Sequence, residues 1–195
     1  CFNPKGNMAV SGSNDKTLKL WDLFHESSRQ QQQEETEDSD NEQMEGADQE
    51  QQPSAKRKRT ALFVPREIGT LQGHFLPVTS VLWLENGLVL SASKDHTLRL
   101  WDVARAHNVN TIQGSKVISS MTFNEKSGTI LTSHPDFLIR MWDSRMKQGK
   151  ASVFRSHKGW VRTVQWNCSN EYQFASGADD NLVKLWDVRS AIPLH

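Results

Sequence analysis

Short stretches of this chain alternate apolar and polar residues with a period of two, which is the pattern of a half-buried β-strand. The alternation is clear in residues 17–21 and 78–83, and Glu85-Asn86-Gly87 forms a hairpin-turn signal after the second of these. No stretch has the 3.6-residue apolar period of an amphipathic helix, so the sequence predicts an all-β fold. The other predicted strands are residues 8–11, 88–93, 97–101, 109–112, 117–123, 130–133, 138–142, 151–154, 161–166, 173–176 and 182–186.

The predicted strands recur in a repeated unit. Residues 71–102 contain a Gly-His pair, two apolar runs, an Asp-His-Thr turn and a closing Trp-Asp, and residues 2–22, 121–143 and 164–187 close in the same way. Each unit has an Asp six residues before its Trp and a Ser or Thr four residues before that Asp. These sets are Ser11/Asp15/Trp21, Ser91/Asp95/Trp101, Thr132/Asp136/Trp142 and Ser176/Asp180/Trp186. Trp142 follows Trp101 by 41 residues and precedes Trp186 by 44, a spacing typical of one propeller blade per repeat.

The repeat divides the chain into blades and an insert. We expect the end of a blade at 1–24, an insert at 25–66, a blade at 67–103, a degenerate blade at 104–144, a blade at 145–189 and the start of a further strand at 190–195. This amounts to about three blades and two partial ones. Because both ends fall within a repeat, we expect the chain to be a fragment of a longer propeller.

The insert differs sharply in composition from the repeats. Residues 26–52 contain ten acidic residues against one Arg, with Met44 as the only large apolar residue, which predicts disorder. The basic cluster Lys56-Arg57-Lys58-Arg59 follows and indicates a nuclear-import signal read by an import receptor, although ordinary solvated loop charge is the alternative. The formal net charge of zero hides this asymmetry.

Composition also bounds the chemistry. Cys1 and Cys168 have neither metal-ligand spacing nor a disulfide framework, which is typical of a reducing compartment. No apolar run approaches the length of a membrane span, and no residue pattern indicates a metal or cofactor.

Ser91, His74 and Asp95 have the composition of a hydrolase triad. However, the same residue types recur as His157, Ser176 and Asp180, and each set is accompanied by a Trp that a nucleophile does not need. We therefore predict structural hydrogen-bond tetrads, completed by Trp101 and Trp186, with no catalytic residue and no enzyme activity. The blade at 104–144 has Ser115 where His is expected, so we expect its network to be broken and the blade to be weak.

The spacing from His74 to Trp101 and from His157 to Trp186 resembles the WD-repeat β-propeller family, whose four-stranded blades surround a channel. TLQGH, SASKDHTLRLWDV and SGADDNLVKLWDVRS further resemble the WD-repeat subunits of the Pescadillo–Block-of-proliferation (PeBoW) complexes. The resemblance implies part of a propeller of seven blades. It also implies a non-catalytic scaffold in a nucleolar complex that matures large-subunit ribosomal RNA and assembles the 60S subunit. The implied partners are Pescadillo and Block-of-proliferation homologues and the pre-60S particle, in the nucleus, nucleolus and nucleoplasm.

The loop face offers candidate partner contacts. Trp160 belongs to no tetrad and is either a blade-edge cap or an aromatic anchor for a partner, and Lys94 and Asp179 precede turn aspartates on the same face. No basic stripe with interleaved aromatic residues is present in the repeats, so we expect no direct RNA contact. The W-D-x-R sequences at 142–145 and 186–189 raise the alternative of a substrate-receptor propeller of a cullin-4 ubiquitin ligase, unless each Arg pairs with the Asp of its own blade.

Overall fold

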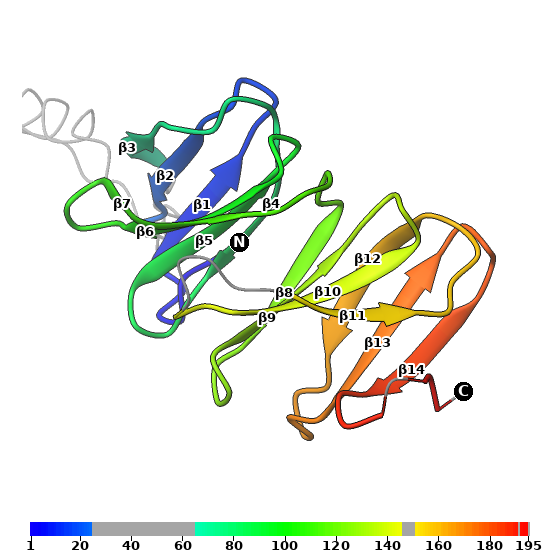
Figure 1. Ribbon diagram of the computed structural model, residues 1–195. Helices are drawn as coiled ribbons and strands as arrows, with labels where there is room; N and C mark the ends of the chain where they lie inside the picture. Colours follow the sequence, from blue (N-terminus) through cyan, green and yellow to red (C-terminus); the bar gives the residue numbers. More distant parts are fainter. Residues whose placement is uncertain (25–64, 146–150, 191, 195) are drawn as a thin grey trace, which may run out of the picture.

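The computed structural model describes residues 1–24, 65–145, 151–190 and 192–194. Over these residues it contains four antiparallel sheets and no helix, which confirms the predicted all-β fold. The sheets follow one another along the molecule in chain order, from β1–β3 at one end to β12–β14 at the other (Figure 1). The predicted insert at 25–66 and its basic cluster lie almost wholly outside the described residues. None of the described segments is a helix of the length and apolar character that a membrane crossing requires.

Each sheet is a meander of strands that are consecutive in the chain. The first has β1 (Met8–Gly12), β2 (Leu18–Asp22) and β3 (Arg66–Leu71), and the second has β4 (Val78–Trp83), β5 (Leu88–Ser93), β6 (Thr97–Asp102) and β7 (His107–Gln113). The third has β8 (Ser120–Asn124), β9 (Thr129–Ser133), β10 (Leu138–Asp143) and β11 (Ser152–Arg155), and the fourth has β12 (Val161–Trp166), β13 (Gln173–Ala178) and β14 (Val183–Asp187).

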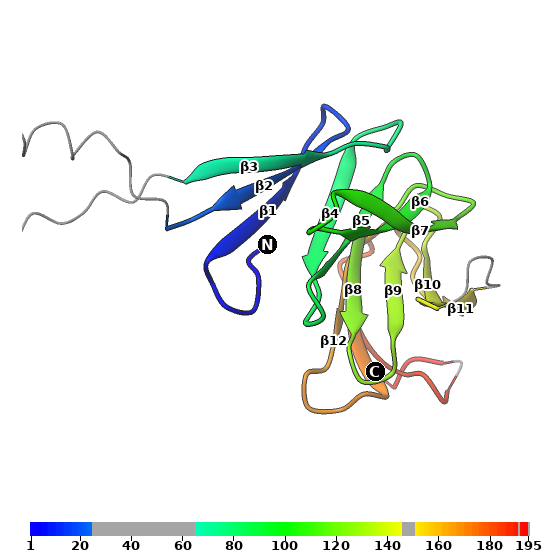
Figure 2. The same ribbon diagram turned by 90° about the vertical axis from the view of Figure 1, so that its left-hand side faces the viewer.

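The core lies between successive sheets, because successive residues of a strand point to opposite faces and both faces of an inner sheet pack against a neighbour. Leu18 and Leu20 of the first sheet pack in one buried cluster with Val89 and Trp101 of the second. Leu90 of the second packs with residues of the third in the same manner, and further apolar residues join the third sheet to the fourth. Figure 2 shows the first sheet facing β4 of the second. The sheets are therefore stacked blades rather than independent hairpins.

The outer strands correct the expected blade boundaries. β3 pairs with β2 from the far side of the insert, with Leu18 opposite Leu71 and Trp21 opposite Glu67. In the same way, β7 belongs to the second sheet and β11 to the third. The expected units 67–103, 104–144 and 145–189 therefore each begin with the outer strand of the preceding sheet, and the unit 1–24 lacks its own outer strand, β3. The reason is that one repeat in the sequence begins with the last strand of the preceding blade.

The blade count changes accordingly. Within the described residues there are two four-stranded and two three-stranded sheets, rather than three blades and two partial ones. A single bridge between Phe2 and Ala9 adds one residue at the open side of β1, and a bridge between Trp186 and Pro193 does the same beside β14.

Candidate functional site

The same tight turn precedes the strand that carries the Trp-Asp pair in every sheet, namely β2, β6, β10 and β14. The residue after each turn Asp has a left-handed backbone conformation, with φ values of 75° for Lys16, 71° for His96, 68° for Phe137 and 61° for Asn181. Asp15 and Asp95 each accept a backbone N–H from the Thr two residues on, at 2.9 Å in both cases. The repeated turn thus presents an Asp carboxylate at the same place in each blade.

The second sheet contains a continuous chain of hydrogen bonds. The Trp101 indole N–H donates to Ser91 Oγ at 2.8 Å, Ser91 Oγ lies 2.7 Å from His74 Nε2, and His74 Nδ1 lies 2.8 Å from Asp95 Oδ2. All four groups are satisfied if Nδ1 carries the proton of a neutral imidazole. Ser91 is fully buried, so no substrate reaches its hydroxyl. This arrangement satisfies buried polar groups, each of which would cost about 1–3 kcal/mol if left unpaired.

The electrostatics of this chain agree with a neutral imidazole. Burial lowers the pKa of His74, and Asp95 only partly opposes that effect. Burial alone would raise the pKa of Asp95, but hydrogen bonds from the Thr97 hydroxyl, the Phe75 N–H and His74 lower it to about 2. Asp95 is therefore charged and His74 neutral at pH 7.

The fourth sheet repeats the chain with its own residues. Trp186 donates to Ser176 Oγ at 2.8 Å, Ser176 Oγ lies 2.8 Å from His157 Nε2, and His157 Nδ1 lies 2.9 Å from Asp180 Oδ2. The backbone N–H of Lys158 also donates to Asp180, and this bond is the main reason why the Asp180 pKa falls to about 2. The second and fourth sheets thus contain the same Ser-His-Asp set, and in each sheet a Trp donates to the Ser. A set that recurs in this way is a structural repeat rather than a single active site.

In the first sheet, the described residues form the Trp–Ser hydrogen bond and the Asp turn but no link between them through a His. Trp21 donates to Ser11 Oγ at 2.9 Å, and Asp15 accepts from the Thr17 hydroxyl at 2.6 Å. These bonds involve the three residues that the sequence places in a partial tetrad, Ser11, Asp15 and Trp21.

The third sheet corrects the expectation of a broken network. His134 Nε2 lies 2.8 Å from Thr132 Oγ1, which also accepts the Trp142 indole N–H at 2.8 Å, and His134 Nδ1 lies 2.7 Å from the Val117 carbonyl. Ser115, where a His was expected, is exposed. Burial, reinforced by the charge of Arg140, lowers the pKa of His134 to about 4, so this imidazole is also neutral at pH 7.

Because the third sheet takes its His from position 134 and not from the loop before its first strand, its turn Asp has a different partner. Asp136, freed from a His, forms two hydrogen bonds with the Arg140 guanidinium at 3.0 and 2.7 Å. A signal for His134 was present in the sequence, because residues two apart on a strand share a face and His134 stands two residues after Thr132.

The predicted loop-face contacts fall into two separate places. The Trp160 indole N–H donates to Ser119 Oγ at 2.7 Å, next to β8 in the neighbouring sheet, and the Arg162 guanidinium lies 3.9 Å from the centre of the Trp160 ring. Arg162 also forms two hydrogen bonds with Asp179, at 2.8 and 2.7 Å. Trp160 and Asp179 thus meet through Arg162, and Trp160 joins two sheets, as a blade-edge cap would. Lys94 is exposed on the second sheet, apart from this group.

The two W-D-x-R sequences have local structural roles. Arg189 pairs with Asp187 at 2.8 Å and lies 4.8 Å from the centre of the Tyr172 ring, and the Arg145 backbone N–H donates to Asp143 at 2.9 Å. The Arg189 side chain thus pairs with the Asp of its own blade, whereas at Arg145 the backbone N–H does so, and neither contact supports the alternative of a ubiquitin-ligase receptor.

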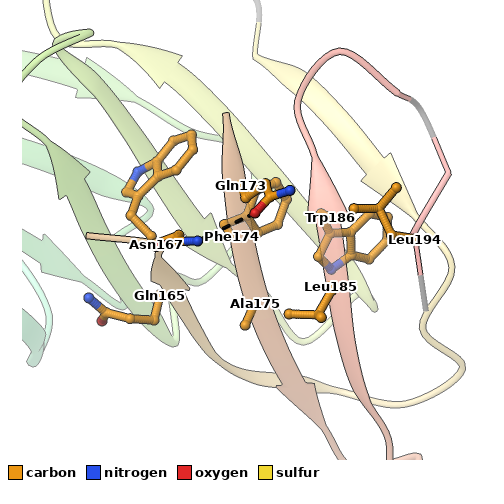
Figure 3. A pocket seen from close by; sticks show the side chains of 9 residues that line it. Gln165, Asn167, Gln173, Phe174, Ala175, Leu185, Trp186 and Leu194 are labelled. Atoms are coloured by element: carbon orange, nitrogen blue, oxygen red, sulfur yellow. Dashed lines mark hydrogen bonds between the residues drawn. The ribbon is translucent and has the colours of Figure 1, made fainter. Parts of the chain in front are cut away.

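The fourth sheet carries a cavity of about 290 Å³ lined by Phe174, Ala175, Leu185, Trp186 and Leu194, among others (Figure 3). Ala175 is paired with Leu185 across β13 and β14. The equivalent line in the second sheet consists of leucines that pack against the third sheet. We therefore interpret the cavity as a sheet-packing surface. Among the described residues, no three His, Cys, Asp or Glu side chains are grouped to hold a metal ion.

Comparison with known proteins agrees with the repeated geometry. The family model "WD domain, G-beta repeat" matches residues 1–22, 65–102 and 149–187. The chain is similar to proteins named ribosome biogenesis protein WDR12 homolog, with 34% identity in Nematostella vectensis, 36% in Ixodes scapularis and 33% in Drosophila mojavensis. These alignments cover 97%, 95% and 97% of this chain but 43%, 42% and 40% of the relatives, so the chain spans about two fifths of their length. With the matched stretches, the stacked three- and four-stranded sheets and the Trp-Ser-His-Asp chains in agreement, the chain belongs to the WD-repeat family.

Proposed function

We propose that this chain is part of a non-catalytic protein-interaction scaffold that acts in ribosome biogenesis. The observation that carries the proposal is the similarity, over nearly the whole chain, to relatives named as ribosome biogenesis proteins. The burial of Ser91 and Ser176 supports the non-catalytic part, because a nucleophile must meet its substrate.

The finer proposal is a nucleolar complex that matures large-subunit ribosomal RNA and assembles the 60S subunit. Its partners would be homologues of Pescadillo and Block-of-proliferation together with the pre-60S particle, and its location the nucleus, including nucleolus and nucleoplasm. Surface character supports protein partners, since the adjacent residues Phe75 and Leu76 are 73% and 46% exposed on the loop before β4. The cluster Lys56–Arg59 would supply the import signal.

Affinity capture from nuclear extract tests the scaffold. The tagged chain is expected to retain large-subunit assembly factors, and a chain in which Lys56–Arg59 are all replaced by Ala is the control for nuclear entry. Capture that returns no such factors from a folded chain would contradict the proposal.

A second measurement separates a scaffold from a hydrolase. A fluorophosphonate probe labels activated serines. We expect the Ser91→Ala and Ser176→Ala chains to show the same labelling as the unchanged chain, because neither serine is expected to react. Labelling of either serine would overturn the non-catalytic assignment.

A further inference from the structure

A basic residue stands two positions before the Trp of every Trp-Asp pair. Three of these four residues have acceptors inside the protein. Lys19 pairs with Glu67 at 2.8 Å, Arg140 pairs with Asp136, and Lys184 donates to Ser156 at 2.9 and 2.6 Å.

Arg99, the fourth, is the exception. Its side chain makes no hydrogen bond or ion pair with any residue in the described part of the chain, and its Nε is buried without a partner. Since a guanidinium has five N–H donors, this group is left with more unused hydrogen-bonding capacity than its three counterparts.

Arg99 is nevertheless held in place. Its guanidinium carbon lies 5.9 Å from the centres of both the Phe75 and Trp101 rings. The absence of a side chain at Gly73 provides space for the guanidinium, because a Cβ at that position would lie 2.7 Å from Arg99 Nη1 and 3.1 Å from the Trp101 ring. The two rings and the limited space beside Gly73 restrict the guanidinium, while its donors have no partner among the described residues. A restricted group loses little freedom when it binds an acceptor.

The surroundings indicate what that acceptor belongs to. A guanidinium fork matches a carboxylate with two parallel hydrogen bonds. Phe75, whose ring lies 5.9 Å from the guanidinium carbon, is 73% exposed, and its chain neighbour Leu76 is 46% exposed, so an apolar rim adjoins the cation. A phosphate backbone is favoured by several cations in line, whereas one cation next to an apolar rim suits an acidic side chain followed by an apolar one.

We propose that Arg99, Phe75 and Leu76 form a docking site for an acidic segment of a partner protein, with a carboxylate on the Arg99 guanidinium and an apolar side chain against Phe75. The proposal deepens the scaffold function and rests on it, because it gives the chemistry of one partner contact.

Fluorescence anisotropy with the purified chain tests the site. The probe is a fluorescein-labelled decapeptide in which Asp and Glu flank one Leu-Phe pair, and the comparison peptide has Asn and Gln in their place. The acidic peptide is expected to bind and the amide peptide is not. Arg99→Met, which keeps the apolar stem, is expected to weaken binding about tenfold or more, since hydrogen bonds to a charged group contribute about that much.

Lys19→Met is the matched control, because Lys19 occupies the same repeat position but is already neutralised by Glu67. It is expected to leave binding unchanged, and Phe75→Ala is expected to weaken it. If Arg99→Met lowers the thermal midpoint, Arg99→Lys replaces it and is expected to bind several-fold less tightly, because a single ammonium cannot reproduce the fork.

Two results would overturn the site: equal affinity in the wild-type and Arg99 variants, or an Arg99-dependent affinity for oligouridine in place of the acidic peptide. Failure of peptide binding by a chain that still captures large-subunit assembly factors would remove this site and leave the scaffold standing. Failure of the capture itself would remove the scaffold.

Discussion

Replacement of His134 by Ala should be among the most destabilising single changes in the third sheet. His134 is completely buried and connects Thr132 Oγ1 to the Val117 carbonyl. The Thr132 hydroxyl would keep the Trp142 N–H as a partner, but the Val117 carbonyl would lose the imidazole donor and a cavity would open. One unpaired polar group together with the lost packing predicts a cost of about 3 kcal/mol in the free energy of unfolding.

Urea unfolding followed by tryptophan fluorescence measures this cost, with Ser115→Ala as the control. Ser115 is exposed, and its replacement should change the free energy of unfolding by less than about 0.5 kcal/mol. If the network were broken in this blade, the two substitutions would have similar small effects. A His134→Ala value as small as the Ser115→Ala value would therefore refute the assignment of His134 to the hydrogen-bond chain.

The pH dependence gives an independent readout of the same residue. The folded pKa of His134 is about 4, whereas an unfolded His titrates near 6.5, so the unfolded chain binds this proton more readily. The stability that depends on neutral His134 is present above pH 6.5 and is lost as the pH falls toward 4. The difference between the folded and unfolded pKa values corresponds to about 3 kcal/mol in the free energy of unfolding. The His134→Ala chain should lack this part of the pH dependence.

Three further changes test the packing and the tetrads. Gly12→Ala would place a Cβ 2.5 Å from Val78 Cγ1, and should cost about 1–3 kcal/mol by urea unfolding because the first two sheets meet there. Trp160→Phe removes the indole N–H that donates to Ser119, and should lower the free energy of unfolding by about 1 kcal/mol. An unchanged free energy of unfolding would contradict the link between the two sheets. The folded pKa of Asp95 is about 2, below its usual value, so its contribution is present above pH 4 and lost as the pH falls toward 2; Asp95→Asn should flatten this range in acid-unfolding curves.

The repeated units were predictable from the sequence because their signals are local. Strand alternation, the turn Asp and the closing Trp all lie within about 30 residues, and the left-handed turn at His96 is part of the same pattern. The sequence also separated the tetrads from a hydrolase triad, since the same residue types recur with a Trp.

What the sequence did not predict depends on non-local pairing. β3 (Arg66–Leu71) has weak alternation and gains its strand structure from β2 on the far side of the insert. The register of the repeat points to the position after Gly114 for the His, whereas the structure uses His134, which directly follows β9. The isolation of Arg99 could not be foreseen either, since Glu67, Asp136 and Ser156, which pair with its counterparts, come from three unrelated positions.

The central proposal, that this chain is part of a ribosome-assembly scaffold, is tested most directly by sedimentation of nuclear extract through a sucrose gradient. The account predicts that the tagged chain sediments with precursors of the large ribosomal subunit, and that it moves to lighter fractions when those precursors are depleted. A folded chain that remains at the top of the gradient while the precursors are intact would contradict the account.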